Sequence, residues 1–289
     1  MQKQTHVDLS IIILSYNTIS LLRRCLASIF TSQMSDDAWE IIVVDNASID
    51  GSADMVARDF PSVRVIKNRK NIGFAAGNNI GIRSSHGSYV LLLNSDAEVR
   101  PGTLRTMLDF LVSYPDAGAA TCRLELVDGS LDPACHRGFP TPWAAMTYFL
   151  GFERLFPRVP LFSQYHAWYK DLSSVHEIDS PSGAFFLVRR SVIDEVGLLD
   201  EDFFMYGEDI DWAYRIKEAG RKILYNPSVS ALHRKKQSGL DQADSLLQKQ
   251  TEKHFYDTMR LFYQKHYAHR YGWAVTALVL WGIKIRSLL

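Results

Sequence analysis

Apolar runs and amphipathic segments alternate over the first 115 positions of the chain. Short apolar runs are typical of strands buried on both faces, and they cover residues 9–14, 41–44, 63–66 and 89–93. Segments with apolar residues three or four positions apart predict helices, and they cover residues 18–32, 50–59, 74–85 and 101–113. Asn17 or Thr18 is expected to cap the first helix, and Pro101 to open the fourth. Strands that alternate with helices predict a mostly parallel, Rossmann-like sheet flanked by helices.

The alternation breaks after residue 115. Residues 123–181 are rich in proline, aromatic residues and turn formers, with one helix expected over residues 143–155. The elements expected beyond them are a strand, a helix, one or two further strands and a helical C-terminal stretch, over residues 184–188, 209–219, 223–232 and 246 onward. We therefore predict an α/β domain with two halves, 1–115 and 116–238, and a C-terminal helical extension, 239–289.

The chain of 289 residues has a formal net charge of zero, from 32 Lys and Arg and 32 Asp and Glu residues. Because there is no basic excess, nucleic acid is not an expected partner. The charge is nevertheless uneven. Residues 253–289 hold six basic side chains and one acidic one (+5), and the rest of the chain holds 26 against 31 (−5). An acidic body is thus joined to a basic tail that is also rich in aromatic residues.

The basic tail contains one short apolar stretch, residues 273–283, followed by Lys284 and Arg286. A membrane span needs about 20 apolar residues, so this stretch is too short to cross a bilayer alone. Two interpretations stay open. Residues 272–289 form a peripheral membrane contact, or they form a helical hairpin that packs on the body or on a second subunit of a homodimer.

The spacing of the cysteines and the length of the first apolar run indicate where in the cell the protein is expected. Cys25, Cys122 and Cys135 are far apart and form no CxxC pair, which suggests neither a zinc knuckle nor a disulfide framework. The first apolar run is too short for a signal peptide. We expect a cytoplasmic protein, either free or at the inner face of the cytoplasmic membrane.

Polar residues follow the first, second and fourth predicted strands, where ligands of parallel sheets bind. They are Ser15, Tyr16 and Asn17; Asp45 and Asn46; and Asn94, Ser95 and Asp96. A carboxylate such as Asp96 can hold a hard divalent cation, but an aspartate after a strand is also a turn former or helix cap. Asp45 has two interpretations as well, as an acceptor for a base or ribose or as a helix cap.

Two further features carry candidate chemistry. Residues 71–79 combine glycines and asparagines at a helix start, which suits either close approach of a phosphate or sugar or tight packing of the helix on the sheet. His233 ends a strand-like segment. It is either structural or a neutral imidazole that completes a metal site.

Residues 203–212 form an unusual aromatic and acidic segment. Glu208 and Asp209 follow four large apolar residues. This pattern suits a general base in a cleft, or acids that interact favourably with a helix N-terminus. Asp211 and Arg215 are spaced to pair on the surface of that helix.

Taken in this order, the motifs resemble those of an inverting glycosyltransferase of family 2 with the GT-A fold. The resemblance rests on SYN after the first strand, VVDNAS after the second, NIGFAAGNN, LLLNSD, SGAFFLVRR and FFMYGEDID, and it covers about residues 9–235. Within the family the chain is most similar to bacterial rhamnosyltransferases of surface-polysaccharide synthesis. The resemblance implies transfer of L-rhamnose from dTDP-rhamnose, with a UDP-hexose as the second choice of donor. The acceptor would be a hydroxyl of a glycan or polyprenyl-linked glycan.

The family implies a role for each matching position. Asp209 would be the catalytic base, with Glu208 as its neighbour. Asp96 and His233 would hold a divalent cation, Mg²⁺ or Mn²⁺, although Asn94 stands where the usual DXD motif has its first aspartate. The residues implied to line the nucleotide-sugar are Ser15, Tyr16, Asn17, Asp45, Asn46, Gly73, Phe74, Gly77, Asn78, Asn94, Ser95, Ser182, Gly183 and Ala184.

Other classes of protein fit the sequence less well. A sugar nucleotidyltransferase needs a glycine-rich, basic signature after the first strand, and a dinucleotide oxidoreductase needs GxGxxG there, whereas this chain has SYN. A non-catalytic GT-A scaffold of a glycan-assembly complex stays open, although the retained Asp96, Glu208 and Asp209 argue against it.

Overall fold

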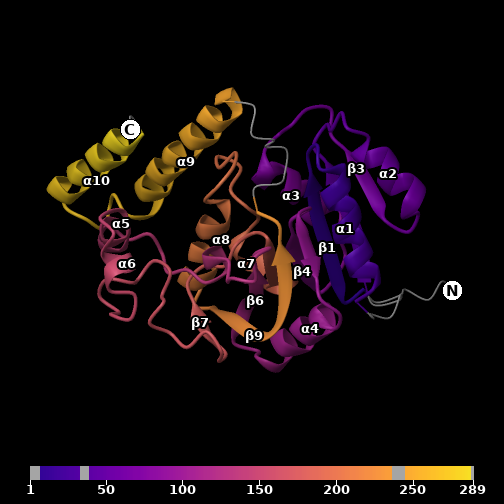
Figure 1. The fold of residues 1–289 in the computed structure, drawn as a ribbon, viewed down its shortest axis with the longest axis horizontal. Coiled ribbons are helices and arrows are strands. Elements are labelled where there is room, and N and C mark those ends of the chain that lie inside the picture. The colour runs from indigo at the N-terminus through magenta and orange to yellow at the C-terminus, as the bar shows by residue number, and fades with distance from the viewer. Residues whose placement is uncertain (1–6, 33–38, 236–244, 288–289) are drawn as a thin grey trace.

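The computed structural model describes residues 7–32, 39–235 and 245–287 (Figure 1). In this part of the chain, nine strands form one sheet in the order β3-β2-β1-β4-β8-β6-β9-β5, with β7 paired to β9. The α/β class, with helices between the strands and a helical C-terminus, is confirmed. The boundary expected at residues 238 and 239 lies outside the described residues.

The first half of the sheet is parallel, as predicted. Its strands are β1 (Leu9–Ser15), β2 (Trp39–Asp45), β3 (Arg64–Lys67) and β4 (Tyr89–Leu93). Ser15 pairs with Asp45, and Asp45 with Lys67, so these strands end at one edge of the sheet. The polar segments that follow β1, β2 and β4 therefore converge.

The second half of the sheet is mixed. Its strands are β5 (Ala97–Val99), β6 (Ala117–Glu125), β7 (His176–Ile178), β8 (Phe185–Arg189) and β9 (Lys222–His233). β8 runs antiparallel to β4 and β6, whereas β6 and β9 are parallel. The sequence pattern missed β5 and β7 because they are three residues long, and β6 because it begins with small residues. β9 is one strand, since a shift in its register with β6 takes up residues 227–229.

Helices connect the strands close to the predicted positions. They are α1 (Ile19–Phe30), α2 (Ser52–Asp59), α3 (Phe74–Arg83), α4 (Thr103–Ser113), α5 (Pro142–Phe149), α6 (Phe152–Leu155), α7 (Arg190–Val196) and α8 (Glu208–Glu218), with a 3-10 turn at Pro133–Cys135. α7 was not predicted, and the helix expected over residues 143–155 breaks at Gly151, whose φ is +78°. Pro101 precedes α4 instead of opening it. The first N–H of α1 donates to Asp50 at 2.8 Å, and not to either residue expected to cap it.

Two glycines of α3 set how closely this helix packs on the sheet. A Cβ atom on Gly77 would lie 2.4 Å from Leu14 Cδ1, and one on Gly81 would lie 2.3 Å from Ile12 Cγ2. The helix therefore lies closer to β1 than a larger residue at either position would permit without a shift. Of the two interpretations of residues 71–79, tight packing explains Gly77.

The three cysteines lie in the interior. Cys25, Cys122 and Cys135 are all buried and all free. Burial raises the pKa of each thiol well above its ordinary value, to about 12 for Cys135. Neutral thiols of this kind are poor nucleophiles and poor metal ligands.

The C-terminal extension consists of α9 (Ser245–His266) and α10 (Trp273–Arg286), at the end of the molecule opposite β3 (Figure 1). Phe262, Tyr263 and Tyr267 from the extension join Phe203 and Tyr214 of the body in a second apolar cluster. The extension is therefore packed on the body at α9, whereas α10 has no buried residue. Within the described ranges, no helix has the length and hydropathy needed to cross a bilayer.

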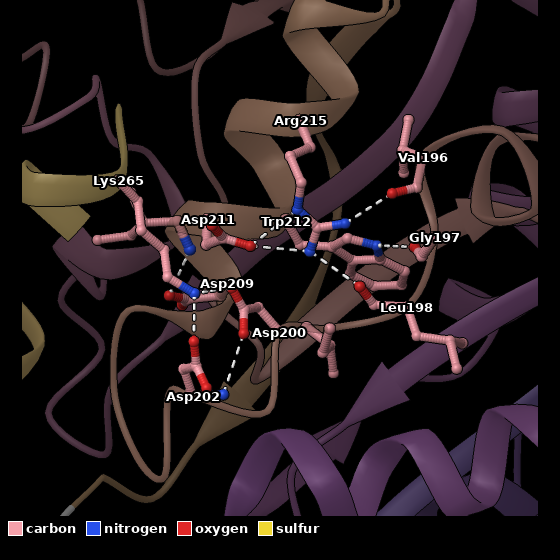
Figure 2. A network of polar contacts seen from close by, with 12 residues as sticks. Val196, Gly197, Leu198, Asp200, Asp202, Asp209, Asp211, Trp212, Arg215 and Lys265 are labelled. Atoms are coloured by element: carbon pink, nitrogen blue, oxygen red, sulfur yellow. Dashed lines mark hydrogen bonds and ion pairs between the residues drawn. The ribbon is translucent and has the colours of Figure 1, made fainter. Parts of the chain in front are cut away.

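Ion pairs also fasten α9 to the body. Lys265 pairs with Asp200 and with Asp202, the second at 2.7 Å, in the loop that leads to α8 (Figure 2). Lys265 is only partly exposed in this position. The basic charge of the tail is thus matched, at α9, by acidic side chains of the body.

A buried carboxylate links α9 to α8. Asp211 is 1% exposed, accepts a hydrogen bond from Arg215 Nε at 2.8 Å, and lies 2.7 Å from His266 Nε2. Arg215 also donates to two backbone carbonyls of the preceding loop (Figure 2). The expected pairing of Asp211 with Arg215 is confirmed, but its expected place on the helix surface is wrong, because α9 covers the pair.

We predict that Asp211→Ala lowers the free energy of unfolding by roughly 3–5 kcal/mol, because it leaves Arg215 with no carboxylate partner in a partly buried site. Urea unfolding followed by circular dichroism measures this change. Asp109→Ala is the matched control, since Asp109 pairs with Arg105 at the same spacing on an exposed surface and should cost under about 1 kcal/mol. Equal losses in the two variants would contradict the burial argument.

Candidate active site

Asp45 ends β2 at the edge of the sheet where the polar segments meet. It is 3% exposed, and its Oδ2 accepts the backbone N–H of Ser48 at 3.1 Å. Its Oδ1 is buried and has no hydrogen-bond partner among the described residues. A buried acceptor without a donor is costly, so Asp45 is suited to accept a hydrogen bond from a bound ligand.

The segment after β1 is held by hydrogen bonds to its neighbours. Ser15 Oγ lies 2.9 Å from Thr18 Oγ1, which in turn donates to Ser95 Oγ at 3.1 Å. Asn17 has a positive φ of 53°, and its side-chain oxygen accepts the N–H of Ile49 at 2.9 Å. Ser15, Asn17 and Ser95 thus fix the loops, whereas the side chain of Tyr16 is exposed at the surface.

Asn46 organises the next loop. Its Nδ2 donates to Asn71 Oδ1 at 3.0 Å and to the carbonyl of Gly73 at 3.1 Å, and its Oδ1 accepts from Asn68 at 2.9 Å. These contacts occupy the Asn46 amide with protein groups. Its geometry is that of a residue that shapes the loop before α3.

Gly73 and Phe74 bring the start of α3 against the segment before α8. Gly73 has a φ of +88°, and a Cβ atom there would lie 2.5 Å from the carbonyl oxygen of Phe204. The N–H of Phe74 donates to the same carbonyl at 2.7 Å. The Phe74 ring reaches Gly183, where an added Cβ would lie 3.2 Å from Cζ. Three of the motifs noted in the sequence therefore meet at this point.

The other residues expected around the sugar divide into two groups. Asn78 is buried and donates to the carbonyl of Phe74 at 3.0 Å, which stabilises α3 itself. Asn94 and Ala184 lie side by side, with the N–H of Asn94 donating to the Ala184 carbonyl at 3.2 Å. Ser182 accepts the N–H of Ala184 at 3.2 Å. The start of β8 therefore borders the end of β4, while Asn78 and Gly77 serve packing.

Asp96 and His233 meet across the β5–β9 pair. His233 Nε2 lies 3.4 Å from Asp96 Oδ1, and both side chains are almost fully buried. His233 Nδ1 lies 2.7 Å from Asp132 Oδ2. Burial lowers the pKa of His233, but its hydrogen bonds to Asp132 and Asp96 outweigh that effect and raise it to about 9. The sequence pattern did not point to Asp132.

Asp96 can offer a carboxylate oxygen to a divalent cation of the hard, oxygen-preferring kind. His233 could join it as a ligand only after losing the proton that its raised pKa favours. A carboxylate that orients Nδ1 of a histidine while Nε2 faces a site is a common second partner of metal-bound imidazole. In the described part of the chain, no group of three or more His, Cys, Asp or Glu side chains could hold an ion. The described residues therefore offer at most two ligands here, Asp96 and His233, and a phosphate and water would have to complete the shell, as is usual for Mg²⁺.

Asp209 lies at the start of α8 and contacts two elements at once. Its Oδ2 accepts from Arg137 at 2.7 Å and from the N–H of Gly183 at 3.2 Å. The Arg137 and Asp209 side chains are 11% and 13% exposed. Burial lowers the pKa of Arg137, but the interactions with Asp209 and Tyr165 together outweigh that effect and raise it, so Arg137 stays charged. Nothing in the sequence pattern singled out Arg137. It lies in the proline- and turn-rich residues 123–181, the irregular region of the chain.

Glu208 differs from its neighbour. It is 5% exposed, and its Oε2 has no hydrogen-bond partner among the described residues. Burial, and then the charge of Asp209, raise the pKa of Glu208 to about 8. Near neutral pH the protonated form of Glu208 therefore predominates. Of the two adjacent acids, Asp209 is the one held in an ion pair and suited to accept a proton.

Comparison with known proteins identifies the family to which this chain belongs. The profile of "Glycosyl transferase family 2" matches residues 10–197. The chain is 30% identical over 250 residues to an N-acetylglucosaminyl-diphospho-decaprenol L-rhamnosyltransferase of Mycobacterium tuberculosis, which is 82% of this chain and 80% of that protein. It is 27% identical to the rhamnosyltransferase WbbL of Escherichia coli over 77% of this chain and 82% of that one.

Solved structures show the same fold. A mannosyltransferase of Pyrobaculum calidifontis, in complex with GDP-Man and Mn²⁺, matches with a TM-score of 0.61 at 19% identity, over 92% of this chain and 65% of that one. GalNAc-T7 with UDP, GalNAc and Mn²⁺ matches with a TM-score of 0.62 at 16% identity, over 89% of this chain and 48% of that one. The chain belongs to glycosyltransferase family 2 and is a glycosyltransferase with a GT-A fold.

We predict that Glu208→Gln removes part of the pH dependence of stability. The folded chain holds a proton on Glu208 that the unfolded chain releases above about pH 4.5, so this residue makes stability fall as pH rises from about 4.5 to about 8. The variant should melt above the parent at pH 8, by at least the few degrees that about 1 kcal/mol gives in a domain of this size. At pH 4.5 the two should melt alike.

Thermal melts at the two pH values measure this difference. Glu218→Gln, on the same helix but exposed and paired with Arg270, is the control and should follow the parent. Identical pH profiles for Glu208→Gln and the parent would show that Glu208 is ionised in the folded chain.

Proposed function

We propose that this glycosyltransferase moves L-rhamnose from dTDP-rhamnose, with inversion, to a hydroxyl of a lipid-linked glycan in cell-surface polysaccharide synthesis. The observation that carries the proposal is the carboxylate of Asp209, held by Arg137 and Gly183 beside the strand end that bears Asp96. The names of the M. tuberculosis and E. coli relatives support the sugar. A UDP-hexose is the alternative donor.

The acceptor proposal rests on the relatives. The M. tuberculosis protein is named for an acceptor that is N-acetylglucosaminyl-diphospho-decaprenol. By analogy, the acceptor here is a glycan on a polyprenyl diphosphate, and the enzyme works at the inner face of the cytoplasmic membrane. The exposed helix α10 supports a peripheral membrane contact in preference to a homodimer contact, because it has no buried residue and two basic side chains in its last turn.

The geometry supports a single displacement. Asp45 would accept a hydrogen bond from the base of the nucleotide, while the loops fixed by Asn17 and Asn46 shape its pocket. Asp96 and His233 would hold a divalent cation, whose charge would offset that of the leaving nucleotide diphosphate. Asp209 takes the proton of the acceptor hydroxyl, the oxygen bonds to the anomeric carbon, and the bond to the diphosphate breaks on the opposite face. One such displacement inverts the configuration.

We predict that Asp209→Asn lowers the turnover number by about 10²–10⁴, the usual contribution of a general base, while binding of the nucleotide-sugar is retained. Transfer to a lipid-linked acceptor and binding of dTDP-rhamnose are measured separately. Asp202→Asn is the control, because Asp202 lies in the preceding loop and pairs with Lys265 at the surface. Turnover near that of the parent in Asp209→Asn would exclude it as the base.

We predict that Asp96→Ala abolishes the metal-dependent part of donor binding. In the parent, dTDP-rhamnose with Mg²⁺ or Mn²⁺ should stabilise the fold by about 2.7 kcal/mol at 100 times the dissociation constant, as a shift in melting temperature. The variant should lose this shift, whereas Asp128→Ala, in an exposed turn, should keep it. Full activity in excess EDTA would contradict the metal role. A larger shift with a UDP-hexose than with dTDP-rhamnose would move the donor assignment to the alternative.

A further inference from the structure

A cavity of about 710 Å³ opens between the irregular region and the C-terminal end of α10. Its walls combine three aromatic rings with three guanidinium groups, from Tyr148, Phe149, Trp168, Arg154, Arg158 and Arg286. None of the residues that line it belongs to the candidate donor or metal site. The cavity is therefore separate from the candidate donor and metal sites, and it is formed by other segments of the chain.

The three arginines of this cavity are available to a ligand. Arg286 lies 5.2 Å from the centre of the Phe149 ring, and none of the three forms an ion pair with another described residue. The one acid in the wall, Glu153, is buried and bonded to His166 at 2.7 Å. Guanidinium groups gathered without carboxylate partners are suited to phosphate, which they bind through paired N–H groups.

Large apolar side chains are exposed next in sequence to the cavity wall and along α10. Leu150 and Leu155, beside the wall residues Gly151 and Arg154, are 63% and 70% exposed, and Leu278 and Trp281 are 66% and 63% exposed on α10. A soluble surface seldom exposes so many large apolar groups together. A cationic cavity on a surface that also exposes large apolar side chains is suited to a molecule that has a phosphate next to a hydrocarbon chain.

The cavity wall is also linked to the proposed catalytic base. The Tyr148 ring lies 5.3 Å from the ring of Tyr165, and Tyr165 is hydrogen-bonded to Arg137, which in turn binds Asp209 at 2.7 Å. Three contacts thus lead from the cavity wall to the proposed base. None of the residues that line the cavity belongs to the loops that follow β1 and β2.

We propose that this cavity binds the phosphate or diphosphate of the lipid-linked acceptor, with the hydrocarbon chain along α10, and so presents the acceptor to Asp209. The inference rests on the proposed function, in which the acceptor is lipid-linked. In this proposal, Arg286 of α10 binds the phosphate of the acceptor directly. Arg154 and Arg158 of the irregular region bind it as well.

The test measures binding of farnesyl diphosphate, a short isoprenoid diphosphate, to the full-length protein by calorimetry. We expect Arg154→Gln combined with Arg286→Gln to weaken binding by about tenfold or more, as charged hydrogen bonds are lost. Lys284→Gln removes one positive charge from the same helix as Arg286 but lies outside the cavity wall, and it should stay within about twofold of the parent. Inorganic pyrophosphate and farnesol should each bind more weakly than farnesyl diphosphate.

Three outcomes would overturn the inference. The first is unchanged binding of farnesyl diphosphate in the double variant, and the second is an equal loss of that binding in Lys284→Gln. The third is a double variant that loses binding to phosphatidylglycerol vesicles but keeps binding of farnesyl diphosphate. That result would assign the arginines to the bilayer surface. Binding of dTDP-rhamnose is measured in every variant and should not change. Failure of the parent to bind any nucleotide-sugar would count against the proposed function, while the comparison of variants would still decide the role of the cavity.

Discussion

The ion pair between Arg137 and Asp209 holds together the parts of the molecule that form the catalytic side of the site. Arg137 comes from the irregular region, Asp209 from the start of α8, and the N–H of Gly183 joins them from the start of β8. Both side chains are largely buried, so loss of either would strand a charge at a cost of roughly 3–5 kcal/mol. The three segments therefore behave as one unit, and the position of the acid is set by chain far from it in sequence.

The sequence predicted what local patterns encode. β1 to β4 and the helices between them follow from short apolar runs and helical spacing, and the strand-end residues Ser15, Asp45 and Asp96 follow from that order of elements. Arg137 and Asp132 could not be found in this way, because their partners lie 72 and 101 positions away. The glycines of residues 71–79 left two interpretations open for the same reason, ligand approach or tight helix packing. Only the contact of α3 with β1 in the folded sheet shows that Gly77 serves packing.

The uneven charge of the chain acquires a structural explanation. Two basic side chains of the extension meet acids of the body: Lys265 pairs with Asp200, and Arg270 pairs with Glu218. The basic residues of α10 form no ion pair with another described residue. The extension therefore has two different parts. Its first helix is part of the body and covers the buried Asp211, while its second presents an apolar and cationic surface to the outside.

The burial of all three cysteines has a practical consequence. With their thiols enclosed and their pKa values raised, the native cysteines are shielded from alkylating reagents and from disulfide exchange as long as the chain is folded. A single cysteine introduced at the surface of α10 would then be the one reactive thiol of the described chain. An environment-sensitive fluorophore attached there could report directly on the surroundings of this helix during turnover, with no native residue removed.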